Sequence, residues 1–426
     1  MDHALITIII LLFAAVMFIW EKLPLSVTAM IVALALTLTG VITPQEAFAG
    51  FVNKNVILFC AMFVVGGALF QTGMASKIGG LVTKFAKSER QLMAAIMIVV
   101  GLLSGLLSNT GTAAILMPVV IGICAKSGFS RSRLLMPLML AAAMGGNMTL
   151  IGAPGNMIAD STLQKMFEGS SFGFFEFAKI GLPILTAGTI FFVLVGYKFL
   201  PERTDVKEET DDTSDIVENV KVVPEWKQYT SLAILVLTIV AMVFQKQIGI
   251  KLHIIGSIGA LLLVVTGVMT EKEAFESIDL KTIFLFGGIL PLAGALNNTG
   301  AGKMIAEAVT GFLGADSSPM VVLAVIFLLA AVLTNFMSNT ATTALLAPIG
   351  VSIAQKLGAD PRAVLMAIVI GGSCAYATPI GMPANAMIYG PGGYKFNDYV
   401  KSGLPLIGVS FVVSMILLPI FWPLFP

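Results

Sequence analysis

The sequence has little charge for its length. Only 12% of its 426 residues are Asp, Glu, Lys or Arg, whereas 57% are hydrophobic and the mean hydropathy is +0.95. A typical soluble domain has about a quarter of its residues charged, so this composition excludes an ordinary soluble protein. The net charge is only +1, which gives no indication of a nucleic-acid partner.

Residues that bind metals or attack substrates are also scarce. The three cysteines, Cys60, Cys124 and Cys374, lie far apart without metal-ligand spacing, so we expect them to pack rather than to form disulfides. The two histidines, His3 and His253, lie at the edges of apolar runs and are poor candidates for ligands. No nucleophile–base pair or metal cluster is present in the apolar segments, so we predict a protein that is not an enzyme and has no organic cofactor.

Long apolar segments dominate the chain instead. Many of them are long enough to cross a hydrocarbon core of about 30 Å. The first, 4–20, has no basic segment before it and no cleavage-site pattern after it, so we interpret it as a retained membrane helix rather than a signal peptide. The sequence therefore predicts an all-α polytopic membrane protein surrounded by lipid.

The two halves of the chain share a series of landmarks at an offset of about 227 to 230 positions. In each half we expect five transmembrane helices, with one interrupted apolar segment, a re-entrant hairpin, between the third and the fourth. Because five is an odd number, the second half must be inverted relative to the first. The matching landmarks are Leu38–Phe48 with Val265–Phe275, Thr72–Gly73 with Thr299–Gly300, Ser108–Thr110 with Ser338–Thr340, and Thr149–Asn156 with Thr378–Asn385.

These repeats define the predicted domains. The N-terminal repeat is 1–200, the linker is 201–228 and the C-terminal inverted repeat is 229–426. The expected spans are 4–20, 24–41, 55–71, 134–163 and 178–199 in the first half, and 229–247, 252–269, 281–297, 363–390 and 403–424 in the second. The hairpins are expected at about 91–125 and 319–355, and the fourth spans, 134–163 and 363–390, are expected to be broken helices.

The orientation follows from the distribution of positive charge. If the linker is cytoplasmic, most of the 25 Lys and Arg lie on the cytoplasmic side, as the positive-inside rule requires. We therefore predict a multi-pass protein of the inner or plasma membrane with both termini outside. The linker contains the acidic run Glu208–Asp212. We interpret it as a solvated tether, with a regulatory or partner-binding role as the alternative.

The hairpins each have the tripeptide Ser-Asn-Thr, at Ser108–Thr110 and Ser338–Thr340, and each has a hydroxyl residue four positions earlier, Ser104 or Thr334. These side chains offer oxygen ligands to a cation and donors to an anion. Their alternative use is hydrogen bonding between membrane helices. Because both copies recur with a broken helix at the same spacing, we predict a binding site.

The broken segments, 145–156 and 371–385, are rich in glycine and proline, so an α-helix cannot continue through them. Unwinding frees backbone carbonyls, which suit a hard cation such as Na⁺, and it exposes helix N-termini, which attract anions. The alternative is a proline kink that neighbouring helices repack.

Lys, Arg, Asp, Glu and His are missing from both hairpin cores and from both broken segments. A proton relay normally needs one. An anionic substrate here would depend on bound Na⁺ and on helix dipoles, which gives a physical reason for obligatory coupling. Asp160 lies just beyond the first broken segment. We interpret it as a solvated boundary residue, with a role in a cation path as the alternative.

The paired Ser-Asn-Thr motifs and the paired Thr-x-x-Gly-x-Pro-x-Asn motifs resemble those of the divalent anion:sodium symporter (DASS, INDY-type) family of the ion-transporter superfamily. The resemblance covers essentially the whole chain. It implies Na⁺-coupled symport of a dicarboxylate, tricarboxylate or sulfate, and a homodimer whose scaffold domains stay fixed while transport domains move as elevators. It also implies two Na⁺ sites and a substrate site between the hairpin tips.

Residue by residue, the resemblance gives three sets of ligands. The first Na⁺ site would use Ser104, Ser108, Asn109 and Gly152, and the second would use Thr334, Ser338, Asn339 and Gly381. The substrate would meet Asn109, Thr110, Asn339, Thr340 and Pro383.

The second loop departs from the dicarboxylate pattern at Met382, where a threonine is common, and the first loop has Ala153 before its proline. Fewer donors weaken the case for a substrate like succinate and leave sulfate or a less polar carboxylate open. The alternative function is a proton-linked transporter, a cation/proton antiporter or an arsenite-type oxyanion exporter on the same scaffold. These would need a titratable residue, for which Asp160 is the candidate.

Overall fold

A computed structural model describes residues 2–20, 22–82, 88–167, 169–203, 223–313 and 318–424. All regular secondary structure in these ranges is helical, so the prediction of an all-helical protein is confirmed for them. The helices of the first half are α1 (His3–Trp20), α2 (Leu25–Leu38), α3 (Pro44–Phe48), η1 (Ala49–Val52), α4 (Lys54–Gln71), α5 (Met74–Val82), α6 (Glu89–Ser104), α7 (Asn109–Ser127), α8 (Arg131–Gly145), η3 (Gly146–Met148), α9 (Pro154–Met166), α10 (Ala178–Leu194) and η4 (Gly196–Phe199).

The second half follows the same order of long helices. They are α12 (Glu225–Val243), α13 (Gln245–Ile248), α14 (Leu252–Val265), α15 (Glu271–Glu276), α16 (Leu280–Asn298), α17 (Ala301–Leu313), α18 (Pro319–Leu333), α19 (Asn339–Leu357), α20 (Pro361–Gly372), α21 (Pro383–Tyr389) and α22 (Phe396–Phe421). Local sequence sets some of these limits. Both α3 and α15 begin with a capping box, in which Thr43 pairs with Glu46 and Thr270 pairs with Glu273.

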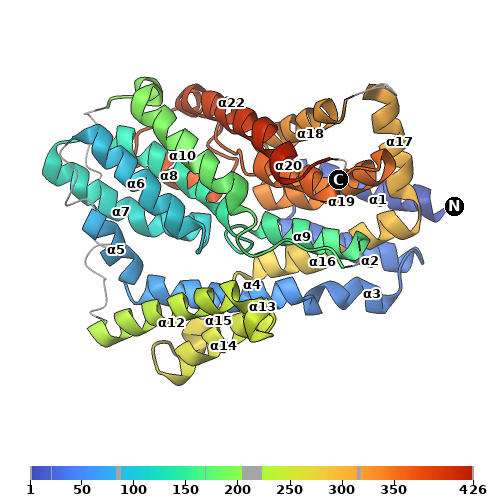
Figure 1. Cartoon of the computed structure of the whole chain (residues 1–426), viewed down its shortest axis with the longest axis horizontal. Helices are drawn as coiled ribbons and strands as arrows, with labels where there is room; N and C mark the ends of the chain where they lie inside the picture. The colour runs from blue at the N-terminus through green and yellow to red at the C-terminus, as the bar shows by residue number, and fades with distance from the viewer. Residues whose placement is uncertain are drawn as a thin grey trace.

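The helices form two bodies (Figure 1). The base body comprises α1–α4 and α12–α16, in which α2 packs on α16 and α4 packs on α14. The hairpin body comprises α6–α10 and α18–α22, in which α6 packs on α8, α18 packs on α20, and α10 packs on α22. The helices α5 and α17 link the bodies along the chain, because α5 contacts both α4 and α7, and α17 contacts both α16 and α19. Helix α9 of the hairpin body also packs on α16 of the base body.

Two glycines let α10 and α22 lie directly on the interrupted helices. An ideal Cβ on Gly181 of α10 would be 2.1 Å from the carbonyl oxygen of Asn147, and one on Gly403 of α22 would be 2.3 Å from that of Tyr376. No larger residue fits at such distances. These contacts bring one long helix of each half against the backbone that directly follows α8 or α20.

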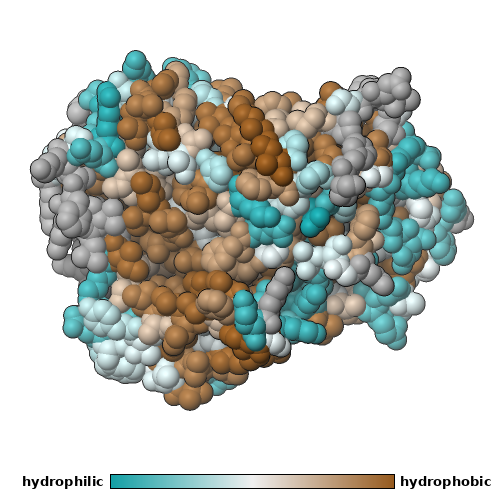
Figure 2. Space-filling model, in the orientation of Figure 1, coloured by the Kyte–Doolittle hydropathy of each residue, from teal (hydrophilic) through white to brown (hydrophobic). Residues whose placement is uncertain are grey.

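The outer surface of the molecule is apolar. Figure 2 shows extensive hydrophobic surface across the middle of the face in view, with hydrophilic patches that are largest at the end of the long axis where the N-terminus lies and are also present toward the opposite end. Large apolar side chains such as Leu237 on α12 and Ile416 on α22 are exposed. Five helices in the described residues are long and apolar enough to cross a membrane: His3–Trp20, Pro44–Gln71 (which includes α3 and η1 ahead of α4), Glu225–Val243, Leu280–Asn298 and Phe396–Phe421.

The helices differ from the expected spans in a few places. The last helix begins at Phe396, well before the expected residue 403, where the carboxylate of Asp398 accepts from the backbone N–H of Lys395 at 2.7 Å. The sequence reasoning missed the connecting helices α5 and α17, whose residues fall between the expected spans and hairpins. Residues 204–222, which hold the acidic run of the linker, lie outside the described residues.

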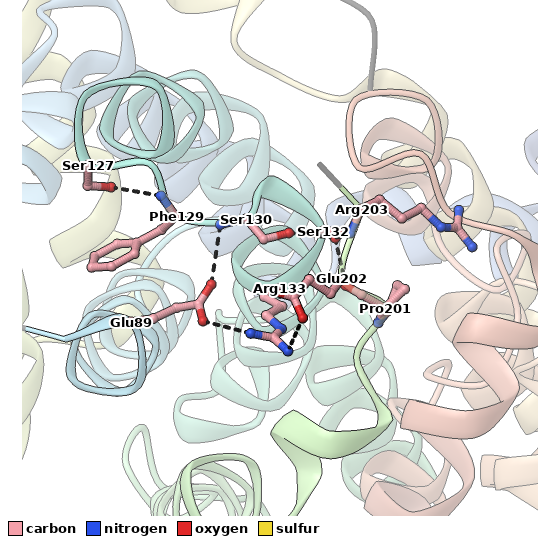
Figure 3. Close-up of polar contacts among 9 residues, drawn as sticks. All are labelled: Glu89, Ser127, Phe129, Ser130, Ser132, Arg133, Pro201, Glu202 and Arg203. Atoms are coloured by element: carbon pink, nitrogen blue, oxygen red, sulfur yellow. Dashed lines mark hydrogen bonds and ion pairs between the residues drawn. The ribbon is translucent and has the colours of Figure 1, made fainter. Parts of the chain in front are cut away.

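The described start of the linker is attached to the hairpin body (Figure 3). Ser132 Oγ on α8 donates to the carbonyl oxygen of Pro201 at 2.6 Å and accepts from the backbone N–H of Arg203 at 3.2 Å. The guanidinium of Arg133 lies 3.1 Å from the carboxylate of Glu89 and 2.9 Å from that of Glu202. Arg203 in turn pairs with Asp398 at the start of α22, at 2.7 Å.

We expect Arg133→Ala to lower the free energy of unfolding by about 1–2 kcal/mol, because the half-buried carboxylate of Glu89 loses its charged donor. The control is Lys272→Ala, whose pair with Glu276 is solvent-exposed and should cost less than about 0.5 kcal/mol. Chemical denaturation of the detergent-solubilised protein measures both. Equal losses in the two variants would show that the Arg133 cluster has no structural role.

Candidate functional site

The two Ser-Asn-Thr tripeptides form the tips of two helical hairpins, between α6 and α7 and between α18 and α19. In each tip the serine is the N-cap of the following helix. Ser108 Oγ accepts from the backbone N–H of Gly111 at 3.0 Å, and Ser338 Oγ accepts from that of Ala341 at 3.2 Å. The N-terminus of a helix of 19 residues therefore opens at each tip, where its dipole favours an anion.

A cluster of polar atoms lies behind the first tip. Ser104 Oγ is 2.6 Å from the carbonyl oxygen of Ala142 and 2.8 Å from one end of the Asn109 amide. That end of the amide is also 3.1 Å from the carbonyl oxygen of Gly152 and 3.3 Å from that of Ala142. If the amide nitrogen points inward, it donates to these oxygens. If the amide oxygen points inward, four oxygens converge, which is the arrangement that a hard cation requires.

The second tip repeats this cluster. Thr334 Oγ1 lies 2.8 Å from the side-chain oxygen of Asn339 and also donates to the carbonyl oxygen of Gly372. One hydroxyl proton cannot serve two acceptors at once. If the Asn339 amide nitrogen points inward, it donates to Thr334 Oγ1; if the amide oxygen points inward, three oxygens converge. Gly381 lies beside the cluster, since an ideal Cβ on it would be 3.0 Å from the carbonyl oxygen of Thr334.

Two asparagines hold the non-helical segments in shape. The side-chain amide of Asn156 donates to the carbonyl oxygens of Gly146 and Thr149, at 2.8 and 2.7 Å. At the matching place in the second half, the amide of Asn385 donates to the carbonyl oxygens of Ala375 and Thr378, both at 2.7 Å. The asparagine that ends each Thr-x-x-Gly-x-Pro-x-Asn motif therefore holds the neighbouring backbone in place by hydrogen bonds.

The two halves meet at these segments. Ser373 Oγ, just after α20, donates to the side-chain oxygen of Asn147, just after α8, at 2.8 Å. The short helix after each break also contacts the hairpin of the opposite half, since α9 packs on α19 and α21 packs on α7. Gly155 at the start of α9 faces the hydroxyl of Thr343 on α19. Each tip is therefore next to elements of both halves.

The remaining predicted substrate residues border the tips. Thr110 and Thr340 are half-buried in the first turns of α7 and α19. Pro383 is exposed at the first position of α21, and Met382 before it is buried. Because α21 contacts α7, Pro383 belongs to the element that lies against the first hairpin. The sequence reasoning missed the carbonyls of Ala142 and Gly372, which only the crossing of α8 and α20 behind the hairpins reveals.

Asp160 is not a solvated boundary residue, and that interpretation is wrong. Its side chain is 1% exposed, because α9 lies between the hairpin body and the base body and contacts both α16 and α4. Its carboxylate accepts hydrogen bonds from the amide of Asn55 on α4 at 2.7 Å, from the amide of Gln164 at 2.5 Å, and from the backbone N–H of Phe172 at 2.7 Å. All three contacts are donors, so the geometry suits an ionised carboxylate.

Within the described ranges, no three His, Cys, Asp or Glu side chains gather in a way that could hold a metal ion. The two oxygen clusters are made of neutral hydroxyl, amide and carbonyl groups.

Comparison with known families decides the class of protein. The family model described as citrate transporter matches residues 15–371 and, in an overlapping segment, residues 340–425. The chain belongs to the citrate transporter family. It is therefore a multi-pass membrane transporter, a class consistent with the predicted absence of enzyme activity.

Relatives support the same class. This citrate transporter family member is 27% identical to an uncharacterized transporter of Haemophilus influenzae, over 97% of this chain and 91% of the relative. It is 23% identical to the sodium-dependent dicarboxylate transporter SdcS of Staphylococcus saprophyticus, over 97% of this chain and 85% of the relative. The YdaH transporter of Alcanivorax borkumensis has a similar fold, with a TM-score of 0.66, 14% identity and 99% of both chains covered.

Proposed function

We propose that the chain is a secondary active transporter of the DASS type, which carries a divalent anion together with Na⁺. The observation that carries this proposal is the pair of oxygen clusters behind the two hairpin tips. In each cluster a side-chain hydroxyl lies within 2.8 Å of an asparagine amide and also within 2.8 Å of a backbone carbonyl oxygen. A second line of support is that some relatives bear the name sodium-dependent dicarboxylate transporter.

The clusters suit Na⁺ better than a soft or multivalent metal. Their ligands are neutral oxygens, whereas transition metals favour imidazole and thiolate. The first Na⁺ site would use Ser104, Asn109 and the Gly152 carbonyl, with Ser108 as the cap of α7 beside it. The second would use Thr334 and Asn339, with Ser338 and Gly381 alongside.

The substrate site lies, in this proposal, between the tips, where Asn109, Thr110, Asn339, Thr340 and Pro383 face the anion. The N-termini of α7 and α19 supply partial positive charge. Because the tip residues include no cationic side chain, the anion is stable there only while Na⁺ is bound. Coupling then follows from electrostatics, since each ligand raises the affinity for the other.

Transport would proceed by movement of the hairpin body against the base body, as an elevator, in a homodimer. The matching order of elements in the two halves and the separate packing of the two bodies support inverted repeats of 1–200 and 229–426. We place the protein in the cell membrane, with the linker 201–228 on the cytoplasmic side and both termini outside.

A proton-linked transporter or oxyanion exporter is the second candidate, because Asp160 is a buried carboxylate at the interface of the two bodies. Against it, the three hydrogen-bond partners of that carboxylate are all donors, an arrangement that stabilises the ionised form and disfavours uptake of a proton. Na⁺ coupling therefore has the stronger support.

The test is thermal stabilisation of the detergent-solubilised protein with a panel of succinate, citrate and sulfate, in Na⁺ and in choline. A ligand that binds only the native state raises its apparent stability by mass action, by about 2.7 kcal/mol at 100 times its dissociation constant. We expect one class of anion to stabilise the protein in Na⁺ but not in choline, and the same anion to be taken up by proteoliposomes. Stabilisation that depends on pH and not on Na⁺ would contradict the proposal.

A further inference from the structure

The residue that directly follows the hydroxyl residue of each oxygen cluster differs in its bonding between the two hairpins. Thr334 is followed by Asn335, whose side chain is buried and makes hydrogen bonds through both its amide nitrogen and its oxygen. Its amide donates to the carbonyl oxygens of Ala331 and Cys374, at 2.7 and 3.0 Å. Its side-chain oxygen accepts from the backbone N–H of Ala377 at 2.8 Å. The second hairpin is thus joined to the broken segment after α20 by a polar joint.

In the first hairpin the equivalent residue is Gly105, which has no side chain to make such bonds. The space beside it is filled by Met148, whose terminal methyl would lie 2.7 Å from an ideal Cβ on Gly105. Met148 occupies the position that Ala377 has in the second half, by the same offset that relates the Thr-x-x-Gly motifs. The first half therefore has a glycine and a flexible methionine where the second has an asparagine and an alanine.

Both hairpins keep one shared bond. The hydroxyl of Thr149 donates to the carbonyl oxygen of Gly105, and the hydroxyl of Thr378 donates to that of Asn335 at 2.6 Å. The difference between the halves is therefore the three side-chain bonds of Asn335. Two of these bonds, to the carbonyl of Cys374 and from the N–H of Ala377, hold residues 374–377 against the hairpin, while the third, to Ala331, stays within α18. The segment that they hold lies immediately beyond Gly372, whose carbonyl belongs to the second oxygen cluster.

We propose that Asn335 is a positioning residue that preorganises the second cation site, so that this site binds Na⁺ more tightly than the first and is filled first. A site that is already ordered loses less conformational entropy when its ligand binds. The first site, joined by Gly105 and Met148, is ordered by the ion itself. This inference rests on the proposed Na⁺ coupling.

The experiment separates the two sites before it tests Asn335. Ser104→Ala removes a ligand of the first site, and Thr334→Val removes a ligand of the second. Asn335→Ala is added to each background, and the dissociation constant for Na⁺ is measured from the Na⁺ dependence of the melting temperature, with choline replacing Na⁺. We expect Asn335→Ala to raise that constant about 10-fold in the Ser104→Ala background, the usual minimum for loss of a ligand-orienting partner. In the Thr334→Val background we expect no change.

A second variant keeps the joint packed. Asn335→Gly with Ala377→Met gives the second half the residue pair of the first, so it tests positioning even if Asn335→Ala does not fold. This double variant should fold, and its dissociation constant for Na⁺ should also rise about 10-fold, the lower end of the range for loss of a residue that orients a metal ligand.

The outcomes are distinct. Equal loss of melting temperature in Na⁺ and in choline, with an unchanged dissociation constant for Na⁺, would overturn the inference and leave the proposed function standing. The same weakening in both backgrounds would also overturn it, because Asn335 would then not act on one site. If the unsubstituted protein shows no Na⁺-dependent stabilisation, the proposed function fails, and this inference fails with it.

Discussion

Asn109→Ala is expected to lower Na⁺-dependent anion uptake by about 100-fold or more. Partners that only orient a metal ligand contribute about 10–100-fold to affinity, whereas Asn109 belongs to the proposed first Na⁺ site itself. One end of its side-chain amide lies 2.8 Å from Ser104 Oγ, 3.1 Å from the carbonyl oxygen of Gly152 and 3.3 Å from that of Ala142. Its removal takes away both an oxygen for the cation and a donor at the start of α7. Uptake of labelled anion into proteoliposomes with an inward Na⁺ gradient measures the loss.

The matched control is Asn298→Ala, the same substitution at an exposed position at the end of α16. It should leave uptake unchanged. Asn339→Ala, at the equivalent place in the second hairpin, should be as severe as Asn109→Ala, because both clusters must be filled for the anion to bind. If Asn109→Ala retained most of the Na⁺-dependent uptake, the first oxygen cluster would have no part in transport.

Asp160→Ala is expected to lower the free energy of unfolding by about 3–5 kcal/mol, the range found when one partner of a buried charged group is removed. The substitution leaves the donors of Asn55, Gln164 and Phe172 without their acceptor in a site that water does not reach. Asp279→Ala is the control, since Asp279 is an exposed N-cap of α16 and its loss should cost only about 1 kcal/mol. Denaturant titration in detergent gives both values.

Exchanging Asp160 and Asn55 distinguishes a structural carboxylate from one that carries a proton. Asp160→Asn alone places an amide donor against the amide of Asn55. Adding Asn55→Asp restores one donor and one acceptor across the interface of α4 and α9, and should recover at least about 1 kcal/mol of the lost stability. Uptake should recover in parallel. Restored stability with no uptake in the exchanged variant would instead favour the proton-linked candidate.

Much of the fold could be predicted from composition and local pattern. Helix breaks fall where glycine and proline gather, after Gly145 and after Gly372, because these residues cannot continue an intrahelical ladder. Hairpin tips fall at Ser108 and Ser338, because serine is a good N-cap. The helices α5 and α17 could not be predicted in this way, since each is a short amphipathic connection whose helicity depends on packing against a hairpin.

Asp160 shows the limit of local reasoning most clearly. Its place just beyond a broken helix indicated a membrane boundary, and from sequence alone nothing places Asn55, more than a hundred residues earlier, against it. Burial of a charge depends on what the rest of the chain puts around it. The same holds for the carbonyls of Ala142 and Gly372, which join the two oxygen clusters only because α8 and α20 pack directly behind the hairpins.

The sequence by itself determined that this protein is helical and membrane-spanning, that two halves share their motifs, and that the candidate site contains oxygen donors without fixed charge. Those properties follow from residue type and spacing, because hydrophobic length, helix breaking and hydrogen-bonding capacity are local. Only the tertiary structure decided which oxygens meet, which carboxylate is buried, and that the Asn335 side chain bonds to the segment after α20 whereas Gly105 packs against Met148. Those properties depend on contacts between residues tens to hundreds of positions apart, which residue type and spacing do not determine.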